Sequence, residues 1–310
     1  MSERAGEDPV RPTGHVVTAH PLVQRSWTAW LPLLTLGVFL FGLLFALLLG
    51  WQFDRTGYCD LQRDAFISLN TTLNAWPAAL WRNLTQFGDA AVLIPLLSPI
   101  ILWRPQAMAA ALAAAPVASL CSVTLKHLMA VPRPAAYLDP DQFIILGRAL
   151  KAKNSLPSGH SLTIFTGVTA VLVTLYLFER SWRMGLLTLV VLLFAGAVAV
   201  SRVAVGAHWP LDTLGGGLLG ILAGIIGAGL ALRYQRWWRL TPGSIARCLV
   251  GVVMLLMSGS LFFQVFKKPE LAVSLGVSGV CGLVALAWLW RGCRSHWLVR
   301  LHKHKRSALQ

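Results

Sequence analysis

The chain has 310 residues, of which 56% are hydrophobic and only 13% are charged, whereas soluble domains carry about 25% charged residues. Its mean hydropathy is +0.64. So few charges cannot coat a soluble domain of this size, and the composition favours a chain embedded in lipid. A formal charge of +15 indicates nucleic-acid binding only where a soluble fold gathers it on one face, so no nucleic-acid partner is expected.

The predicted elements begin after a polar N-terminal stretch. Residues 1–25 contain Pro, Gly and mixed charge, which is typical of a flexible tail. The apolar run Leu31–Gly50 exceeds a signal-peptide core of about 7–15 residues and has no small-residue cleavage site, so we predict a retained first helix. Apolar residues at helical spacing between Asp60 and Trp81 then predict an amphipathic helix on the outer membrane surface.

Seven further apolar runs bring the predicted number of membrane helices to about eight, because several reach the roughly 20 residues that a spanning helix needs. The second run of the chain is short, and we expect its helix to begin near Asn83. The runs are Val92–Trp103, Met108–Leu125, Leu162–Phe178, Leu186–Val200, Leu211–Leu232, Leu249–Phe266 and Leu271–Trp290. Backbone amides in lipid must pair within their own segment, so the predicted fold is an all-α integral membrane protein.

The distribution of basic residues predicts the orientation. If the N-terminus is cytoplasmic, 16 of the 27 Lys and Arg fall in inner loops or tails. This bias agrees with the positive-inside rule and places both termini in the cytoplasm.

Three polar stretches carry the chemistry, and the predicted topology places all of them at the outer side. The first runs from Lys126 to Pro134, at the end of the third apolar run. The second is Pro157-Ser158-Gly159-His160, before the fourth run, and the third is Ser201–Asp212, which joins the fifth run to the sixth. The helix count rests on hydropathy alone, so this agreement is independent support for one shared site.

Cations in these stretches predict an anion site. Lys126, Arg133 and Arg202 would each cost up to about 2.5–3.5 kcal/mol at mid-bilayer without a partner. Ser158 and Gly159 precede a helix whose first amides point outward, and Gly159 permits close backbone approach. A phosphoryl group takes an arginine fork, a lysine charge and backbone amides at once, so phosphate fits better than a carboxylate.

Two histidines add reactive groups. Asp212 follows His208 at i+4, so its carboxylate can accept a hydrogen bond from one imidazole nitrogen and leave the other free as a nucleophile. His160 directly follows Gly159 and is placed to protonate a leaving oxygen. A metal site of two histidines and one carboxylate is the rival interpretation, but three neighbouring cations would repel a metal ion. We therefore predict neither metal nor cofactor.

The pattern K-x6-RP, PSGH and SR-x5-H-x3-D resembles the three-part signature of the type 2 phosphatidic acid phosphatase family. The resemblance covers about residues 54–232, including a Thr-x-x-Gly stretch at Thr85–Gly88. It implies a six-helix core in which His208 forms a phosphohistidine, Asp212 orients it and His160 is the acid. By the same resemblance, the phosphoryl oxygens are held by Lys126, Arg133, Ser158, Gly159, Ser201 and Arg202.

The domain division follows from that core and the remaining segments. We expect a cytoplasmic tail over 1–25, the six-helix phosphatase core over 26–235, two additional transmembrane helices over 236–291 and a basic cytoplasmic tail over 292–310. Glycines 215, 216, 217, 220 and 224 predict small-residue helix packing rather than a phosphate loop.

The expected function is hydrolysis of a lipid phosphate or diphosphate at the periplasmic face of a bacterial inner membrane. Undecaprenyl diphosphate, phosphatidylglycerol phosphate, phosphatidic acid and lipid A are the substrates considered. Arg148, Lys151 and Lys153 favour a diphosphate, because they can attract a second phosphate. Two alternatives stay open: a phosphotransferase passing phosphate from undecaprenyl diphosphate to another lipid, and a non-enzymatic lipid-phosphate carrier. The expected partners are membrane lipids, and the oligomeric state is not predicted.

Overall fold

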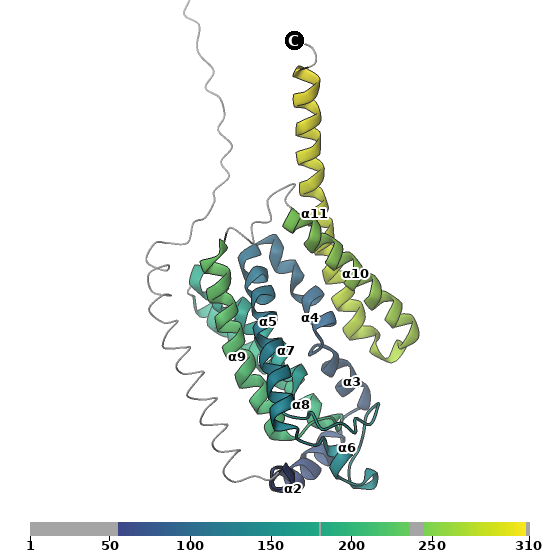
Figure 1. Ribbon diagram of the computed structural model, residues 1–310. Coiled ribbons are helices and arrows are strands. Elements are labelled where there is room, and N and C mark those ends of the chain that lie inside the picture. The colour runs from purple at the N-terminus through teal and green to yellow at the C-terminus, as the bar shows by residue number, and fades with distance from the viewer. Residues whose placement is uncertain (1–54, 180, 236–244, 308–310) are drawn as a thin grey trace, which may run out of the picture.

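The computed structural model describes residues 55–179, 181–235 and 245–307, and in these ranges the chain forms helices and no strand (Figure 1). The α-helices are α2 (Arg55–Leu73), α3 (Ala78–Gln86), α4 (Ala90–Leu97), α5 (Pro105–Met129), α6 (Pro134–Tyr137), α7 (Gly159–Phe178), α8 (Trp182–Ala204), α9 (Pro210–Arg233), α10 (Ile245–Lys267) and α11 (Ala272–Ser307). Three short 3₁₀ helices join them: η1 (Ser98–Leu102), η2 (Pro140–Gln142) and η4 (Pro269–Leu271).

The predicted all-α membrane fold is confirmed over the described residues. Six helices are long and apolar enough to cross a membrane, and a bent pair, α3 with α4 and η1, brings the number to seven. These spans match the predicted helices from the second onward. The predicted first helix, Leu31–Gly50, and the tail 1–25 lie outside the described residues.

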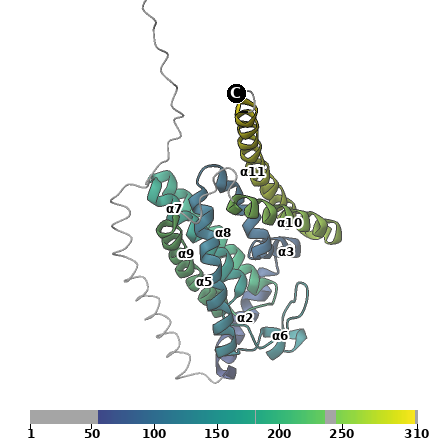
Figure 2. The ribbon, with the colours of Figure 1, turned by 45° about the horizontal axis from the view of Figure 1, so that its top comes forward.

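Helices α5, α7 and α9 form the centre of the bundle, with α8 packed mainly on α7 (Figures 1 and 2). Glycines bring α9 against its neighbours: a Cβ added to Gly216 would lie 2.5 Å from the Ser158 carbonyl oxygen, and one on Gly220 would lie 2.5 Å from that of Leu162. The predicted small-residue packing is confirmed, because only glycine allows these backbones to approach so closely.

The second predicted membrane helix is broken, which corrects the prediction of one helix from Asn83 to Trp103. Helices α3 and α4 are bent by 72° at residues 87–89. Asp89 starts α4, and its carboxylate accepts a hydrogen bond from the Ala91 amide at 2.9 Å. Gly88 lies at the bend against His160, since an added Cβ would be 2.6 Å from the His160 Cβ. Hydropathy does not detect such a bend, because the two arms are apolar enough for one span only when they are taken together.

The predicted amphipathic helix from Asp60 to Trp81 is also wrong as a single helix. Helix α2 ends at Leu73, and α3 begins after Pro77. Proline disfavours helical backbone at the residue before it, so the chain turns at Asn74–Pro77. Phe66 of α2 is fully buried, whereas Leu69 of the same helix and Trp76 in the turn are exposed. Helix α2 therefore packs one part of its surface into the core and leaves another part exposed.

Helices α10 and α11 form a hairpin that packs on α3, α4 and η1 (Figure 2). The Asn83 side chain joins the two parts, donating to the Glu270 carbonyl at 2.7 Å and accepting from the Ser274 amide at 3.1 Å. Helix α11 continues beyond Trp290 to Ser307, so much of the predicted basic tail is helical. The hairpin thus contacts the broken span and leaves the other side of the bundle uncovered by these helices.

Candidate active site

The first polar stretch follows the C-terminal end of α5. Ala130 has a left-handed backbone (φ 46°), and its amide donates to the Lys126 carbonyl, which ends the helix. Pro132 and Pro134 prevent the helix from continuing. The chain then runs beside the segment before α7, with the Arg133 amide donating to the Ala152 carbonyl at 3.1 Å. Lys126 and Arg133 are therefore placed at the same end of the bundle.

The second stretch forms the start of α7. Ser158 is its N-cap, and its hydroxyl accepts from the Ser161 amide at 3.5 Å and the Ser161 hydroxyl at 3.1 Å. The Lys126 ammonium reaches this turn, since a Cβ added to Gly159 would lie 3.4 Å from Nζ. A helix start with a lysine beside it is suited to an anion, because free amides and a positive charge meet there.

The third stretch turns between α8 and α9. Gly206 has φ 74°, a conformation that suits glycine, and an added Cβ would lie 2.8 Å from the Ile144 carbonyl oxygen. The turn places His208 two residues before Pro210, the first residue of α9. Asp212 caps this helix, accepting from the Trp209 amide at 3.0 Å. One carboxylate therefore both starts α9 and stands beside His208.

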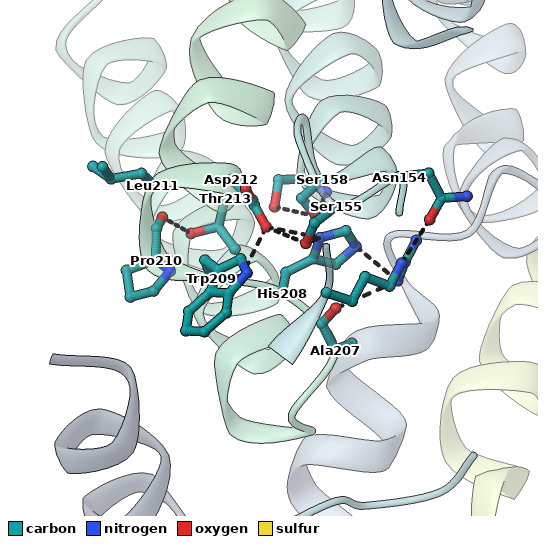
Figure 3. A network of polar contacts seen from close by, with 12 residues as sticks. Asn154, Ser155, Ser158, Ala207, His208, Trp209, Pro210, Leu211, Asp212 and Thr213 are labelled. Carbon is teal, nitrogen blue, oxygen red and sulfur yellow. Dashed lines mark hydrogen bonds and ion pairs between the residues drawn. The ribbon is translucent and has the colours of Figure 1, made fainter. Parts of the chain in front are cut away.

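His208 lies between the carboxylate and a guanidinium (Figure 3). Its Nδ1 is 3.4 Å from Asp212 Oδ2 and also 3.4 Å from the Ser155 hydroxyl, while its Nε2 is 3.3 Å from Arg133 Nη1. This network assigns the Nδ1–H tautomer, because Nδ1 faces an acceptor and Nε2 faces a donor. The free electron pair is then on Nε2, which points to the cations.

The surroundings of His208 favour its neutral form. Burial lowers its pKa well below the ordinary value near 6.5, and the charges of Arg133, Arg202 and Lys126 lower it further. A neutral imidazole is the nucleophilic form. Arg133 also stands where a metal ion bound to Nε2 would lie, so this histidine does not fit the alternative of a metal ligand.

Arg202 retains unused hydrogen-bonding capacity. It is buried, and its Nη1 donates to the Thr85 hydroxyl at 2.5 Å. Among the described residues, its Nε has no hydrogen-bond partner. Lys126 makes no hydrogen bond or ion pair within the described ranges. A buried donor without a partner, such as Arg202 Nε, is costly unless a ligand satisfies it. The lysine, the arginine and the first amides of α7 together can bind the oxygens of one phosphoryl group.

His160 lies at the edge of a cavity of about 370 Å³. The cavity runs between α4, α5 and α7, and apolar residues such as Leu93, Leu97 and Met108 dominate its lining. Gly88 and Gly159 lie at the same end as His160. The start of α7 and His160 thus border a space suited to hydrocarbon.

The structure brings most of the predicted site residues together. His208, Asp212, Arg133 and Ser158 belong to one polar network, and Lys126 lies at Gly159, next to His160. Ser201 differs, because its hydroxyl donates to the Val198 carbonyl of its own helix at 2.6 Å. The Thr85–Gly88 stretch reaches the site, where Thr85 binds Arg202 and Gly88 contacts His160.

Three residues that the sequence did not identify complete the network. Asn154 accepts from Arg133 Nε at 2.8 Å, Ser155 donates to Asp212 Oδ2 at 2.5 Å and Tyr58 donates to Asp212 Oδ1 at 2.7 Å. Asn154 and Ser155 lie only a few residues before the second stretch, and that proximity was a usable signal. Tyr58 is 154 positions from its partner, and nothing in the local sequence marks it.

Comparison with known proteins agrees with this site. The family model described as the PAP2 superfamily matches residues 106–239. YbjG of Escherichia coli (strain K12), provisionally named an undecaprenyl-diphosphatase, is 34% identical over 196 residues, which are 58% of this chain and 92% of the relative. The chain belongs to the PAP2 superfamily. The resemblance stated from the motifs is thereby confirmed.

Further relatives of this PAP2 protein are more distant. The undecaprenyl-diphosphatase of Sulfolobus acidocaldarius is 36% identical over 95 residues, covering 31% of this chain and 41% of that protein. Among solved structures, Aquifex aeolicus LpxE is 26% identical with a TM-score of 0.46, covering 59% of this chain and 98% of that one. A PAP2-type phosphatidylglycerolphosphate phosphatase from Bacillus subtilis is 21% identical with a TM-score of 0.49, covering 65% and 98%.

Proposed function

We propose that this PAP2 protein is a lipid phosphatase that hydrolyses a lipid phosphate or diphosphate through a phosphohistidine on His208. One observation carries the proposal. His208 presents Nε2 to the cations, while its Nδ1 side faces Asp212. An imidazole held in this way is a nucleophile aimed at a bound anion.

In the first step, His208 Nε2 attacks the phosphorus in line with the leaving oxygen. A P–N bond forms, the P–O bond to the leaving group breaks, and His160 donates a proton to the departing oxygen. Asp212 accepts the Nδ1–H hydrogen bond and stabilises the positive charge that develops on the imidazole. Lys126, Arg133, Arg202 and the amides at Ser158 and Gly159 bind the remaining phosphoryl oxygens and stabilise their charge in the transition state.

In the second step, water attacks the phosphorus of the phosphohistidine. His160, which has lost its proton, accepts one from that water, and the P–N bond breaks to release inorganic phosphate. Neither step changes an oxidation state, and His160 returns to its protonated form at the end of the cycle. The three cations supply the positive charge that a metal ion contributes in other phosphatases, so we expect turnover to survive EDTA.

The apolar cavity beside His160 favours a lipid over a soluble phosphate ester. Its lining comes from membrane-spanning helices and is mostly apolar. A hydrocarbon chain can therefore enter the cavity without burying polar groups of the protein. Undecaprenyl diphosphate is our first choice of substrate, because two relatives are named for hydrolysing it. Phosphatidylglycerol phosphate, phosphatidic acid and lipid A are the other substrates to be tested.

The basic loop before α7 is a further reason to favour a diphosphate. Arg148, Lys151 and Lys153 are exposed, and the same loop holds Arg133 through the Ala152 carbonyl and the Asn154 side chain. A second phosphate next to the first would meet this positive field.

The same proposal places the protein in a bacterial inner membrane, with the site at the periplasmic face and both termini in the cytoplasm. The basic residues support this orientation, and the E. coli relative supports the bacterial membrane. The division into a core over 26–235, two added helices over 236–291 and flanking tails is part of the proposal. A reporter enzyme that works only in the cytoplasm should be active when it is fused after Gln310, and one that works only in the periplasm should be inactive there.

Release of inorganic phosphate from the purified full-length protein, measured with each of the four lipids separately, tests the function. We expect the wild type to release phosphate fastest from undecaprenyl diphosphate. His208→Gln should bind the lipid but release no phosphate. Turnover by His208→Gln at the wild-type rate contradicts the nucleophile assignment. Binding without release by the wild type supports the carrier alternative.

The phosphotransferase alternative predicts a different dependence on acceptor. With a single lipid and water, a hydrolase releases phosphate at its full rate, whereas a transferase releases little until a second lipid is added. An acid-labile, base-stable phosphoenzyme, trapped by rapid quench in the wild type and missing in His208→Gln, tests the covalent step that the two activities share.

A further inference from the structure

Tyr58 contacts the carboxylate beside the proposed nucleophile although it comes from a distant part of the chain. It is in the first turn of α2, is 2% exposed, and donates its phenolic hydrogen to Asp212 Oδ1 at 2.7 Å. It precedes the segment matched by the family model, which begins at residue 106. The contact is therefore an observation about this chain rather than a property of the matched motifs.

The two oxygens of Asp212 have different partners. Oδ2 accepts from the Ser155 hydroxyl at 2.5 Å and the Trp209 amide at 3.0 Å, and it lies 3.4 Å from His208 Nδ1. Within the described part of the chain, the partner of Oδ1 is the Tyr58 hydroxyl. Without that hydrogen bond, Oδ1 would be a buried carboxylate oxygen lacking a donor, which is unfavourable.

We propose that Tyr58 is a positioning residue for His208: by holding Asp212 Oδ1, it keeps Oδ2 directed at Nδ1 and limits how strongly Asp212 attracts the imidazole proton. This inference rests on the proposed role of His208 as the nucleophile. Tyr58 is not placed to touch the phosphate, because the carboxylate stands between it and the imidazole. Its effect is expected on the rate of the chemical step rather than on substrate affinity.

Helix α2 is fixed by contacts that do not involve the Tyr58 hydroxyl. Gln62 accepts from the Leu211 amide at 2.8 Å, and Asn70 donates to the Val203 and Ala204 carbonyls at 3.0 and 3.1 Å. The Phe66 ring packs edge-on against Trp209, with centroids 5.1 Å apart. Removing only the hydroxyl of Tyr58 should therefore leave α2 in place.

Tyr58 stays a neutral donor across the range in which the enzyme can be assayed. Burial and the negative charge of Asp212 raise the pKa of its phenol far above the ordinary value. The charged groups that act on His208 are Asp212 on one side and Arg133, Arg202 and Lys126 on the other, with His160 across the site. The Tyr58 hydrogen bond changes only the first of these influences.

The sign of the effect follows from linkage. A donor to Asp212 reduces the attraction between the carboxylate and a protonated His208, so its removal should raise the pKa of His208. In Tyr58→Phe, we expect kcat to fall about 10-fold, the magnitude typical of a hydrogen bond to a charged group, with KM unchanged. The acid limb of kcat/KM against pH should move to higher pH.

Tyr137→Phe is the matched control. Tyr137 also donates to a carboxylate, Asp60 at 2.6 Å, and also lies by Trp209, with ring centroids 6.1 Å apart. Its acceptor is outside the site, so its pH profile should equal that of the wild type. A second variant, 3-fluorotyrosine at position 58, keeps the shape and the hydroxyl but donates more strongly, and should move the acid limb to lower pH.

Three results separate the possibilities. An active wild type, an inactive His208→Gln and a Tyr58→Phe with wild-type kcat and acid limb overturn the inference alone. A wild type without phosphate release overturns the proposed function itself. If Tyr58→Phe does not fold, the fluorotyrosine protein decides, since an acid limb that stays in place or moves to higher pH overturns the role of the hydroxyl.

Discussion

The two sides of the site differ in how completely their polar groups are paired. On the histidine side, Tyr58, Ser155 and the Trp209 amide all donate to Asp212, which faces His208. On the phosphate side, the Arg202 Nε is buried without a partner, and Lys126 makes no hydrogen bond within the described ranges. One side is held in position by the protein, and the other retains donors for a ligand.

This difference indicates which interactions precede substrate binding. Orientation of the nucleophile requires fixed geometry. A saturated hydrogen-bond network provides it, because its groups do not have to reorganise during the reaction. Charge stabilisation requires donors that are directed at developing negative charge and are not already neutralised by protein carboxylates. We therefore expect substitutions on the histidine side to affect kcat, and those on the phosphate side to affect kcat/KM and binding together.

Asp212→Asn should have the largest effect on the paired side. An amide cannot accept from Tyr58, Ser155, Trp209 and His208 as the carboxylate does, so the imidazole tautomer and the surrounding donors lose their arrangement. We expect kcat to fall roughly 10³–10⁴-fold, as for the comparable change in other histidine–aspartate pairs, while lipid binding persists. Asp60→Asn, on exposed α2 surface, is the matched control, and equal losses in the two variants would contradict the assignment.

Arg202→Lys tests the unpaired side. The substitution keeps a positive charge but removes the planar fork, including the donor to Thr85 and the unpaired Nε. Loss of one such donor typically lowers the rate about 10²–10³-fold, and we expect kcat/KM to fall by about 10²-fold. Arg183→Lys, at the opposite end of the same helix, should have wild-type activity. A binding constant for inorganic phosphate that does not change would contradict a role for Arg202 in the anion site.

The pH profile measures how the two sides act on each other. Burial lowers the pKa of His208, and the cations of the phosphate side lower it further, so His208 should remain neutral and active below the ordinary value of about 6.5. We expect kcat/KM at pH 5.5 to stay within about threefold of that at pH 7, whereas an unperturbed histidine would lose about tenfold. His208 has a lower pKa in the folded protein than in the unfolded chain. Below about pH 6.5 the unfolded chain therefore binds more protons, and the free energy of unfolding should fall with pH.

The spans and the reactive residues were predictable because both are local in sequence. Hydropathy over about 20 residues locates a spanning helix. The i+4 spacing of His208 and Asp212 places the two side chains together, because the chain turns into α9 between them. Lys126, Arg133, Ser158 and Arg202 come from four helix ends, and alternating topology places all of these ends on one side. The meeting of the three stretches thus follows from the helix count.

The bend at residues 87–89 and the support from Tyr58 were not predictable for a shared reason. Both depend on contacts with other elements, of Gly88 with His160 and of Tyr58 with Asp212. Hydropathy averages over such a bend, and a tyrosine in an amphipathic stretch has no local mark of its partner. Ser201 shows the reverse limit, since a motif position does not determine that its hydroxyl turns back to Val198.

The smallest expected effect concerns the exposed basic loop, which borders the phosphate side without belonging to it. Replacing Arg148, Lys151 and Lys153 together by Gln should raise KM for a lipid diphosphate about threefold at low salt, because exposed charges interact weakly across solvent. KM for the matching monophosphate should not change, and the difference should vanish near 1 M salt, where the Debye length is about 3 Å. Equal changes for both lipids would show that the loop attracts anionic membrane surface in general and does not recognise the second phosphate.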